Sequence, residues 1–327
     1  MLCINSALLV RLAIGCCLIL NQAGYAADYA SFTMDNDILV GSDDGYTNGL
    51  YYSWYYVSED PNRALQPKIL VKPLLWSLSD APANITASAY SVGQAMITPE
   101  DITQENPDPN DLPYSGLLEF TYSYLNVYDH YADKISTSIG IVGPESGAKS
   151  TQKFVHDLLG ADDPKGWSSQ LNNEVVFQFS RSRAWRSWVS GSERFDILLG
   201  AEAALGTLES SVGSGAMLRV GSGLSRSYPS VLLINSRTTN PVAEDGGWFA
   251  YLGIRVRYTF NQIFTDGNTF TDSPATELDH TQVGATAGFS HAWENFTVTL
   301  AVEDLTLFEN RFEGVSRFGT ITLGWKL

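Results

Sequence analysis

Cysteine is nearly absent from this chain of 327 residues, and its three copies all lie within the first 26 positions. There Arg11 is followed by an apolar run at 12–20 and by the small-residue site at 24–27. That order is typical of a secretory signal peptide whose apolar core is too short to span a bilayer. We therefore expect residues 1–26 to be a signal peptide and residues 27–327 to form one domain. Without cysteine, that domain has neither disulfides nor a thiol nucleophile.

Basic side chains are also scarce. Lysine and arginine number 20 against 36 acidic residues, a net charge of −16 that becomes −17 when Arg11 leaves with the signal peptide. Such an acidic chain is a poor partner for nucleic acid, because phosphate contacts need clustered lysine and arginine. Binding to an anionic surface would need divalent cations as a bridge.

Long apolar runs and several catalytic motifs are missing as well. No stretch after residue 26 approaches 18 apolar residues, so a transmembrane helix is excluded. The chain has no His-Glu-x-x-His zinc motif, no phosphate-binding glycine loop and no Gly-x-Ser-x-Gly elbow. The common zinc protease, nucleotide-binding and serine hydrolase classes therefore lack support.

What recurs along the whole chain is alternation with a period of two, which predicts strands. Between residues 252 and 260, aliphatic and aromatic side chains alternate with Arg255 and Arg257. Inward arginines opposite an aliphatic face suit a lipid-bathed barrel with a polar lumen, whereas a soluble sandwich shows the reverse. The final residues, 320–327, alternate in the same way up to the C-terminus, as in the closing strand of an outer-membrane barrel.

Twelve segments show this pattern, an even number, as a closed bacterial barrel requires. They lie near residues 29–37, 49–57, 88–97, 116–125, 135–142, 173–183, 195–206, 212–222, 248–260, 281–293, 296–308 and 316–327. We therefore predict an all-β protein, a twelve-stranded antiparallel transmembrane β-barrel with a short helix in an extracellular loop.

An even strand number places both termini in the periplasm, so the connections after the first, third and fifth strands face outward. These connections hold the densest polar motifs, within 35–49, 98–113 and 143–174. We expect the three to converge on one rim. On the opposite side the connection 58–87 is long and contains an apolar run at 69–76, which suggests an amphipathic helix at the inner interface.

The third outer connection breaks the strand alternation. Between 143 and 160, apolar residues recur with helical spacing at positions 154, 155, 158 and 159, and Gly160 is a suitable C-terminal stop. We predict a short helix over the barrel mouth, packed by this apolar stripe and presenting His156 from one face. A solvated loop histidine is the alternative, because histidine is functional mainly when its partners set its pKa.

The first outer connection is rich in oxygen ligands. It contains Asp35, Asn36 and Asp37, followed by Thr47 in the run 42–49. Carboxylate, amide and hydroxyl oxygens are the ligands of a hard cation such as calcium. The spacing is not that of an EF-hand, and acidic turn residues are common, so a solvated loop is the alternative.

At these residues the chain resembles the LpxR-like lipid A 3′-O-deacylases of Gram-negative outer membranes. The resemblance is strong from residue 28 to about 183, and afterwards only barrel character persists. The matching pieces are Asn36-Asp37, 46–49, Thr98-Pro99, 111–116, 141–147, Gln152, His156, Gly160, Gly166-Trp167, Gln170-Leu171 and Glu174.

The resemblance implies a calcium-dependent esterase that removes the 3′-linked acyloxyacyl chain of lipid A at the outer face of the outer membrane. His156 matches the general base that activates water, and Asp37, with Asn36 and Thr47, matches the cluster that positions calcium and the carbonyl. Asp162 would orient or shield the site. The expected partners are lipopolysaccharide and outer-membrane lipids, and we expect a monomer.

One departure from the family bears on the bound headgroup. Family members can carry a lysine in the second outer connection, suited to a lipid A phosphate, whereas residues 99–113 contain no basic residue. Three other readings remain: the same groups acting on phospholipid acyl esters, a non-catalytic barrel or pore, and a hydrolase using Ser146. Serine caps helices well, so Ser146 more naturally begins the helix.

Overall fold

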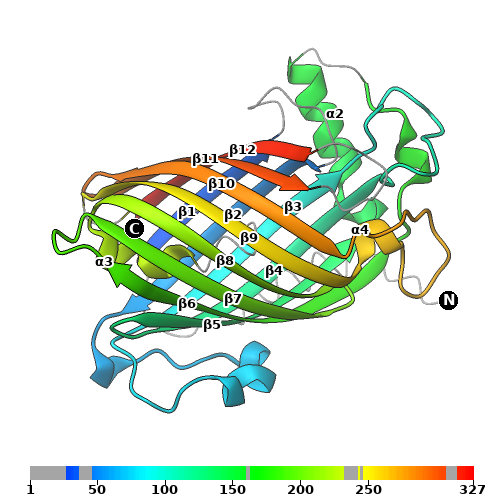
Figure 1. The fold of residues 1–327 in the computed structure, drawn as a ribbon. Helices are drawn as coiled ribbons and strands as arrows, with labels where there is room; N and C mark the ends of the chain where they lie inside the picture. The colour runs from blue at the N-terminus through cyan, green and yellow to red at the C-terminus, as the bar shows by residue number, and fades with distance from the viewer. Residues whose placement is uncertain (1–26, 37–45, 160–162, 232–241, 244–245, 307–314) are drawn as a thin grey trace.

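The computed structural model describes residues 27–36, 46–159, 163–231, 242–243, 246–306 and 315–327. They form a closed barrel in which every strand pairs antiparallel with its sequence neighbours and the first strand pairs with the last (Figure 1). The strands are β1 (Tyr29–Asn36), β2 (Tyr46–Ser58), β3 (Ile85–Ile97), β4 (Ser115–Val127), β5 (Tyr131–Val142), β6 (Glu174–Val189), β7 (Phe195–Gly206), β8 (Glu209–Ser222), β9 (Trp248–Gln262), β10 (Thr281–Ala292), β11 (Phe296–Thr306) and β12 (Val315–Lys326). The predicted twelve-stranded fold is confirmed. The expected signal peptide lies outside the described residues and stays a prediction.

Short helices occupy the connections. They are η2 (Pro61–Arg63), η3 (Ile69–Ser77), η4 (Pro144–Ser146), α2 (Ala148–Leu159), η5 (Gly166–Ser169), α3 (Leu224–Ser227) and α4 (Ile263–Asp266). Within the described ranges, no helix is both long enough and apolar enough to cross a bilayer.

The two faces of the wall follow the predicted alternation. On β9, Leu252 and Ile254 point outward and are 64% and 66% exposed. The alternate residues point into the lumen, where Arg255 pairs with Glu303 at 2.8 Å and Arg257 pairs with Glu202 at 3.0 Å. Ion pairs in the lumen and bare aliphatic side chains outside are the arrangement of a membrane barrel.

The barrel closes where the two ends of the chain meet. β1 and β12 pair from Tyr29 opposite Lys326 to Asn36 opposite Gly319. A buried hydrogen bond between the hydroxyls of Thr33 and Thr322, 2.9 Å apart, joins the two strands inside the lumen. Closure leaves no unpaired strand edge, which a chain in lipid needs because no water is there to satisfy it.

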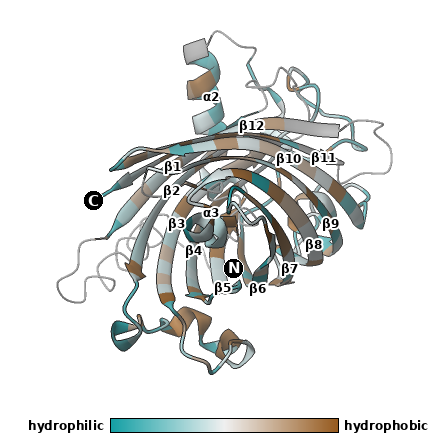
Figure 2. Cartoon of the chain, turned by 60° about the vertical axis from the view of Figure 1, so that its left-hand side comes forward, coloured by the Kyte–Doolittle hydropathy of each residue, from teal (hydrophilic) through white to brown (hydrophobic). Residues whose placement is uncertain are grey.

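The connection between β8 and β9 folds into the barrel at the rim where β1 begins and β12 ends, and α3 lies within this mouth (Figure 2). Arg219 holds α3 there by donating to the Ser227 hydroxyl at 3.0 Å and the Leu224 carbonyl at 2.7 Å, while pairing with Asp196. The hydroxyl of Tyr228 donates to the Tyr131 carbonyl at 2.8 Å. The described part of this connection therefore obstructs the lumen from one end.

Candidate functional site

Helix α2 lies outside the barrel wall, at the rim opposite the one where β1 begins and β12 ends (Figures 1 and 2). Its first residue, Ala148, and the preceding Ser146 pack directly on Gly116 of β4, where a Cβ atom would have no room. Gly116 shares its face with Leu118, which is 39% exposed, so this is the outward face of the wall. The predicted helix exists, but its expected place over the barrel mouth is wrong.

Two glycines bring the chain onto that outer face. Gly143 and Gly147 bracket η4 with φ angles of 101° and 77°, which are left-handed values that favour glycine. The Ser146 carbonyl then accepts from Gln94 Nε2 at 2.7 Å, which ties the turn to β3. The Ser146 hydroxyl is 3.4 Å from the Ala148 N–H at the start of α2 and is buried against Gly116. Ser146, which we expected to begin the helix, therefore lies two residues before the first residue of α2.

The face of α2 that meets the protein is polar. Ala148, Gln152 and His156, spaced four residues apart, are 1%, 2% and 8% exposed and so share one buried face. Phe154, on another face, is 68% exposed. Phe154 therefore does not pack the helix as expected, while the side chains of 158 and 159 lie outside the described residues. His156 is presented from one face, as expected. Gln152 is buried because it is hydrogen-bonded to Trp167, and the exposed side of the helix carries Lys149, Lys153 and Asp157 beside Phe154.

Gln152 fixes the orientation of this buried face. Its Oε1 accepts from Trp167 Nε1 at 2.6 Å, and Trp167 is itself 2% exposed. Trp167 packs on Tyr114 with ring centroids 4.9 Å apart, and burial raises the pKa of Tyr114 to about 12. The second and third outer connections are therefore one packed unit around α2, and the position of His156 depends on both.

The acidic second connection is stabilised within itself. Asp101 accepts from the Thr103 hydroxyl at 2.6 Å, and this bond, with one from Gln104, lowers the pKa of Asp101. The basic residue that the fold brings beside it is Lys165 of the third connection, whose N–H donates to the Ile102 carbonyl at 2.9 Å. The second connection lacks the lysine that family members can carry there, but Lys165 of the third connection brings a positive charge to the same place.

The other predicted residues lie at the outer ends of β1 and β2. Asn36 ends β1 and stands opposite Asn48 of β2; both side chains are buried. Thr47 lies at the irregularity where β2 shifts register against β3, between Tyr46 and Asn48. Asp37, Asp162 and the side chain of Thr47 lie outside the described residues, so their predicted roles stay predictions.

One register row connects these residues to the helix. Asn36 is opposite Asn48, Asn48 is opposite Met96, and Met96 is opposite Gly116, on four consecutive strands. Met96 packs in one buried cluster with Ala148, Tyr114 and Trp167. The row therefore places Asn36 and Asn48 at the level of the wall on which α2 is seated.

Asn48 is a residue that the sequence reasoning missed. Its Oδ1 is buried and has no hydrogen-bond partner among the described residues. The signal was present, because Asn48 follows Thr47 in the same motif. Among the described residues, no group of three histidine, cysteine or acidic side chains is arranged so that it could hold a metal ion.

A closed barrel with an aliphatic outer wall, a polar lumen and a buried polar row at one rim defines the chain as an outer-membrane β-barrel protein. Residues 8–327 match the family model described as "Outer membrane protein LpxR", and the chain belongs to this LpxR family. The resemblance seen in the motifs is confirmed.

One solved structure supports the fold. LpxR from Salmonella typhimurium superposes with a TM-score of 0.73 at 15% identity, covering 91% of this chain and 100% of that one. The translocator domain of the autotransporter NalP from Neisseria meningitidis reaches a TM-score of 0.44 at 9% identity, covering 98% of this chain and 96% of that one. No curated protein matches the chain in sequence.

Proposed function

We propose that the chain is a lipid A deacylase that hydrolyses the 3′-O-linked acyloxyacyl ester in the outer leaflet of the outer membrane. The observation that carries the proposal is the place of His156. It is 8% exposed, on the wall-facing side of a helix seated on the outward face of the barrel. A lipid in the surrounding leaflet reaches that face directly, whereas a soluble substrate in the lumen does not.

The proposed chemistry needs one base. His156 removes a proton from a water molecule as its oxygen attacks the ester carbonyl, and then returns that proton to the 3′ oxygen as the ester bond breaks. The products are the free acyloxyacyl acid and the 3′ hydroxyl, so atoms and charge balance. Gln152, one turn earlier on the same face, positions His156 through its bond to Trp167.

The donors at the rim fit calcium. Asn36, Asp37 and Thr47 are the proposed ligands, and the buried Asn48 Oδ1, which has no partner among the described residues, is a further hard oxygen donor beside Asn36. When bound, such a cation stabilises the negative charge that develops on the carbonyl oxygen. Exchanging Asn48 for leucine should weaken calcium binding measured by calorimetry, independently of any assay of turnover.

The deciding experiment measures lipid A by mass spectrometry after expression of the protein in an outer membrane, with calcium or with a chelator. We expect loss of one acyloxyacyl chain with calcium only. His156→Gln should abolish the mass change, and His130→Gln, in the turn between β4 and β5, is the matched control that should retain it. Unchanged lipid A with the wild-type protein and calcium would refute the proposal. Loss of acyl chains from phospholipids instead would assign the same site to a phospholipase.

A further inference from the structure

The long connection between β2 and β3 packs against the barrel wall. Residues 59–84, called here the wall segment, fold back along the outside of the barrel, over β4, β5 and β6 (Figure 1). Val71 of η3 is fully buried in a cluster with Tyr90, Tyr122 and Ile135 of the wall. The helix predicted in this segment is a 3-10 helix, Ile69–Ser77, and it contacts the face that elsewhere meets lipid.

Polar side chains of the barrel wall hold the wall segment by donating hydrogen bonds to its backbone carbonyls. Tyr124 donates to the Leu65 carbonyl at 2.8 Å, and Thr137 donates to the Leu70 carbonyl at 2.7 Å. These wall residues share the outward face with Leu118 and Ile139, which are 39% and 44% exposed higher on the same strands. The wall segment therefore covers a stretch of outward surface that is polar and would be unstable against bare lipid.

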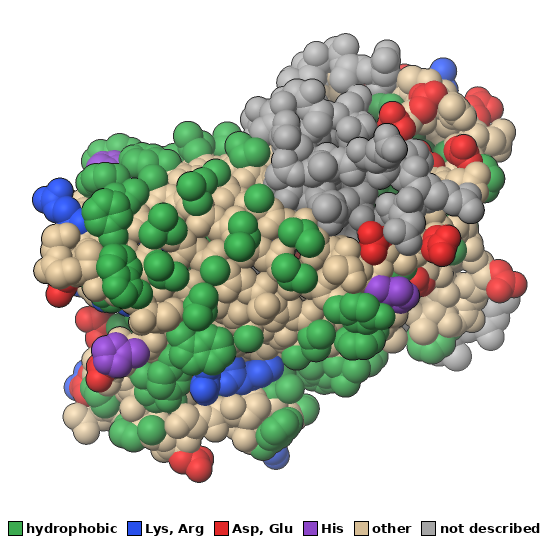
Figure 3. Space-filling view, viewed as in Figure 1, with side chains coloured by type: hydrophobic (Ala, Val, Ile, Leu, Met, Phe, Trp, Pro, Cys, Tyr) green, Lys and Arg blue, Asp and Glu red, His purple; other side chains and the backbone are tan. Residues whose placement is uncertain are grey.

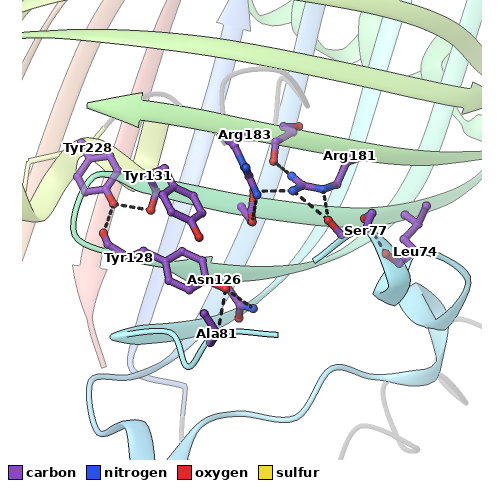
Figure 4. Close-up of polar contacts among 11 residues, drawn as sticks. Leu74, Ser77, Ala81, Asn126, Tyr128, Tyr131, Arg181, Arg183 and Tyr228 are labelled. Atoms are coloured by element: carbon purple, nitrogen blue, oxygen red, sulfur yellow. Dashed lines mark hydrogen bonds and ion pairs between the residues drawn. The ribbon is translucent and has the colours of Figure 1, made fainter. Parts of the chain in front are cut away.

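Beneath the wall segment the outward face carries three charges. Asp133 is fully buried, and its carboxylate accepts from Arg183 Nε at 2.6 Å, from Arg183 Nη2 at 2.7 Å and from Arg181 Nη2 at 2.5 Å. Arg181 continues to the Ser77 carbonyl of the segment (Figure 4). Two arginines against one aspartate leave a net charge of about +1 at this place.

Arg183 is the member of this group that reaches the surface. Its side chain is 32% exposed, and its Nη1 makes no hydrogen bond within the described ranges. The guanidinium lies 4.6 Å from the ring centre of Tyr131 and 5.9 Å from that of Trp185. Basic side chains come to the surface between the apolar wall and the wall segment (Figure 3).

Neighbouring tryptophans indicate the level in the bilayer at which Asp133, Arg181 and Arg183 lie. Trp185 and Trp188 on β6 are 37% and 50% exposed, and exposed tryptophans of a barrel mark the level of the lipid headgroups. On η3 of the wall segment, Ile69 and Trp76 are 80% and 84% exposed. Short turns such as 128–130 and 293–295 lie at this rim, where β1 also begins and β12 ends. Short turns mark the periplasmic side of such barrels.

The middle of the wall segment is basic. Between residues 61 and 79 it has Arg63, Lys68 and Lys72 and no acidic residue, whereas Glu59, Asp60 and Asp80 lie toward its ends and make the whole segment neutral. Arg63 lies 3.9 Å from Asp60, so Lys68 and Lys72 are the basic side chains of the segment offered to a ligand. All three basic side chains are exposed. We propose that the wall segment and Arg183 form a binding site for an anionic phospholipid of the inner leaflet, whose phosphate accepts from Arg183 and whose acyl chains contact Ile69 and Trp76.

The site is separate from the proposed deacylase site, which lies at the opposite rim, so the two proposals fail independently. To test it, the folded full-length barrel in detergent is titrated with phosphatidylglycerol, or with diacylglycerol carrying the same acyl chains, and bound lipid is counted by native mass spectrometry. We expect retention of phosphatidylglycerol and none of diacylglycerol. Arg183→Gln should bind roughly tenfold more weakly, the loss typical of one charged hydrogen bond.

The matched control is Arg194→Gln, which removes an exposed arginine at the same rim and should bind as the wild type does. Heat-modifiable migration in gels reports whether each variant folds. If Arg183→Gln does not fold, the double variant of Lys68→Gln with Lys72→Gln decides, because it leaves the pairing with Asp133 intact. Equal binding of both lipids, or wild-type affinity in Arg183→Gln or in the double variant, overturns the proposal.

Discussion

Gly116 supports the proposed active site from a distance, and replacing it with alanine tests that dependence. A Cβ at this position would collide with Ser146 Oγ and with the Cβ of Ala148, the first residue of α2. The backbone φ of Gly116 is not in the left-handed region, so the strain would come only from packing. Overpacking of this kind costs about 1–3 kcal/mol, and the structure relieves it by moving α2 away from the wall.

Because His156 lies on the same face of α2, it moves with the helix. A displacement of about 1 Å at a reacting group lowers turnover roughly a hundredfold. We therefore expect Gly116→Ala to deacylate lipid A about 10 to 100 times more slowly than the wild type while the barrel stays folded. Rates come from mass spectra of lipid A at timed intervals, and gel migration without heating reports folding.

The control substitution is Gly200→Ala on β7, where the nearest atom to an added Cβ is 3.9 Å away. It should leave the rate unchanged. If Gly116→Ala turns over lipid A as fast as Gly200→Ala does, then α2 is not held by this contact and the inferred seat of His156 is wrong.

Three further changes test other parts of the structure. Gln152→Leu leaves the buried Trp167 N–H without its acceptor, a loss of about 1–3 kcal/mol in the seating of α2. It should slow deacylation, and because neither residue belongs to a strand, the midpoint at which the barrel strands unfold in urea should not change. Asp133→Asn leaves two paired arginines without their carboxylate and should lower the free energy of unfolding by about 3 kcal/mol, the lower end for buried pairs because the arginines keep partial exposure. The wild-type barrel should conduct little current in planar bilayers, and deletion of 224–231 should raise its conductance. Large wild-type currents without ester turnover would favour the pore.

The strands could be predicted because each face of the wall meets a different solvent. Leu252 and Ile254 face lipid while Arg255 and Arg257 meet carboxylates, so the alternation in the sequence is the alternation in space. The register row from Asn36 to Gly116 could not be predicted, because it depends on pairing across four strands. Packing of the second and third outer connections against each other was predictable from strand parity alone, whereas residues 37–45 of the first lie outside the described residues.

The packing of α2 could be predicted only in part. Amphipathic spacing shows that a helix has two faces, but it does not show which polar groups find a partner in the fold. Trp167, fifteen residues further on, donates to Gln152, so Gln152 is buried while Phe154 is exposed. The wall segment is a similar case, because nothing in its spacing shows that it folds back over β4 to β6.

The pairing of β1 with β12 has a consequence for when activity can begin. Asn36 stands at the outer end of the strand that completes the ring, opposite Gly319. Contacts between residues nearly 300 positions apart form late in folding, since the whole intervening chain must first be ordered. The donors proposed for calcium come from the β1–β2 hairpin and can meet locally, but the pairing of β1 with β12 is what fixes that hairpin in the closed wall. Until the ring closes, these donors would lie at an open edge of the sheet, so we expect full activity to begin only with the closed barrel.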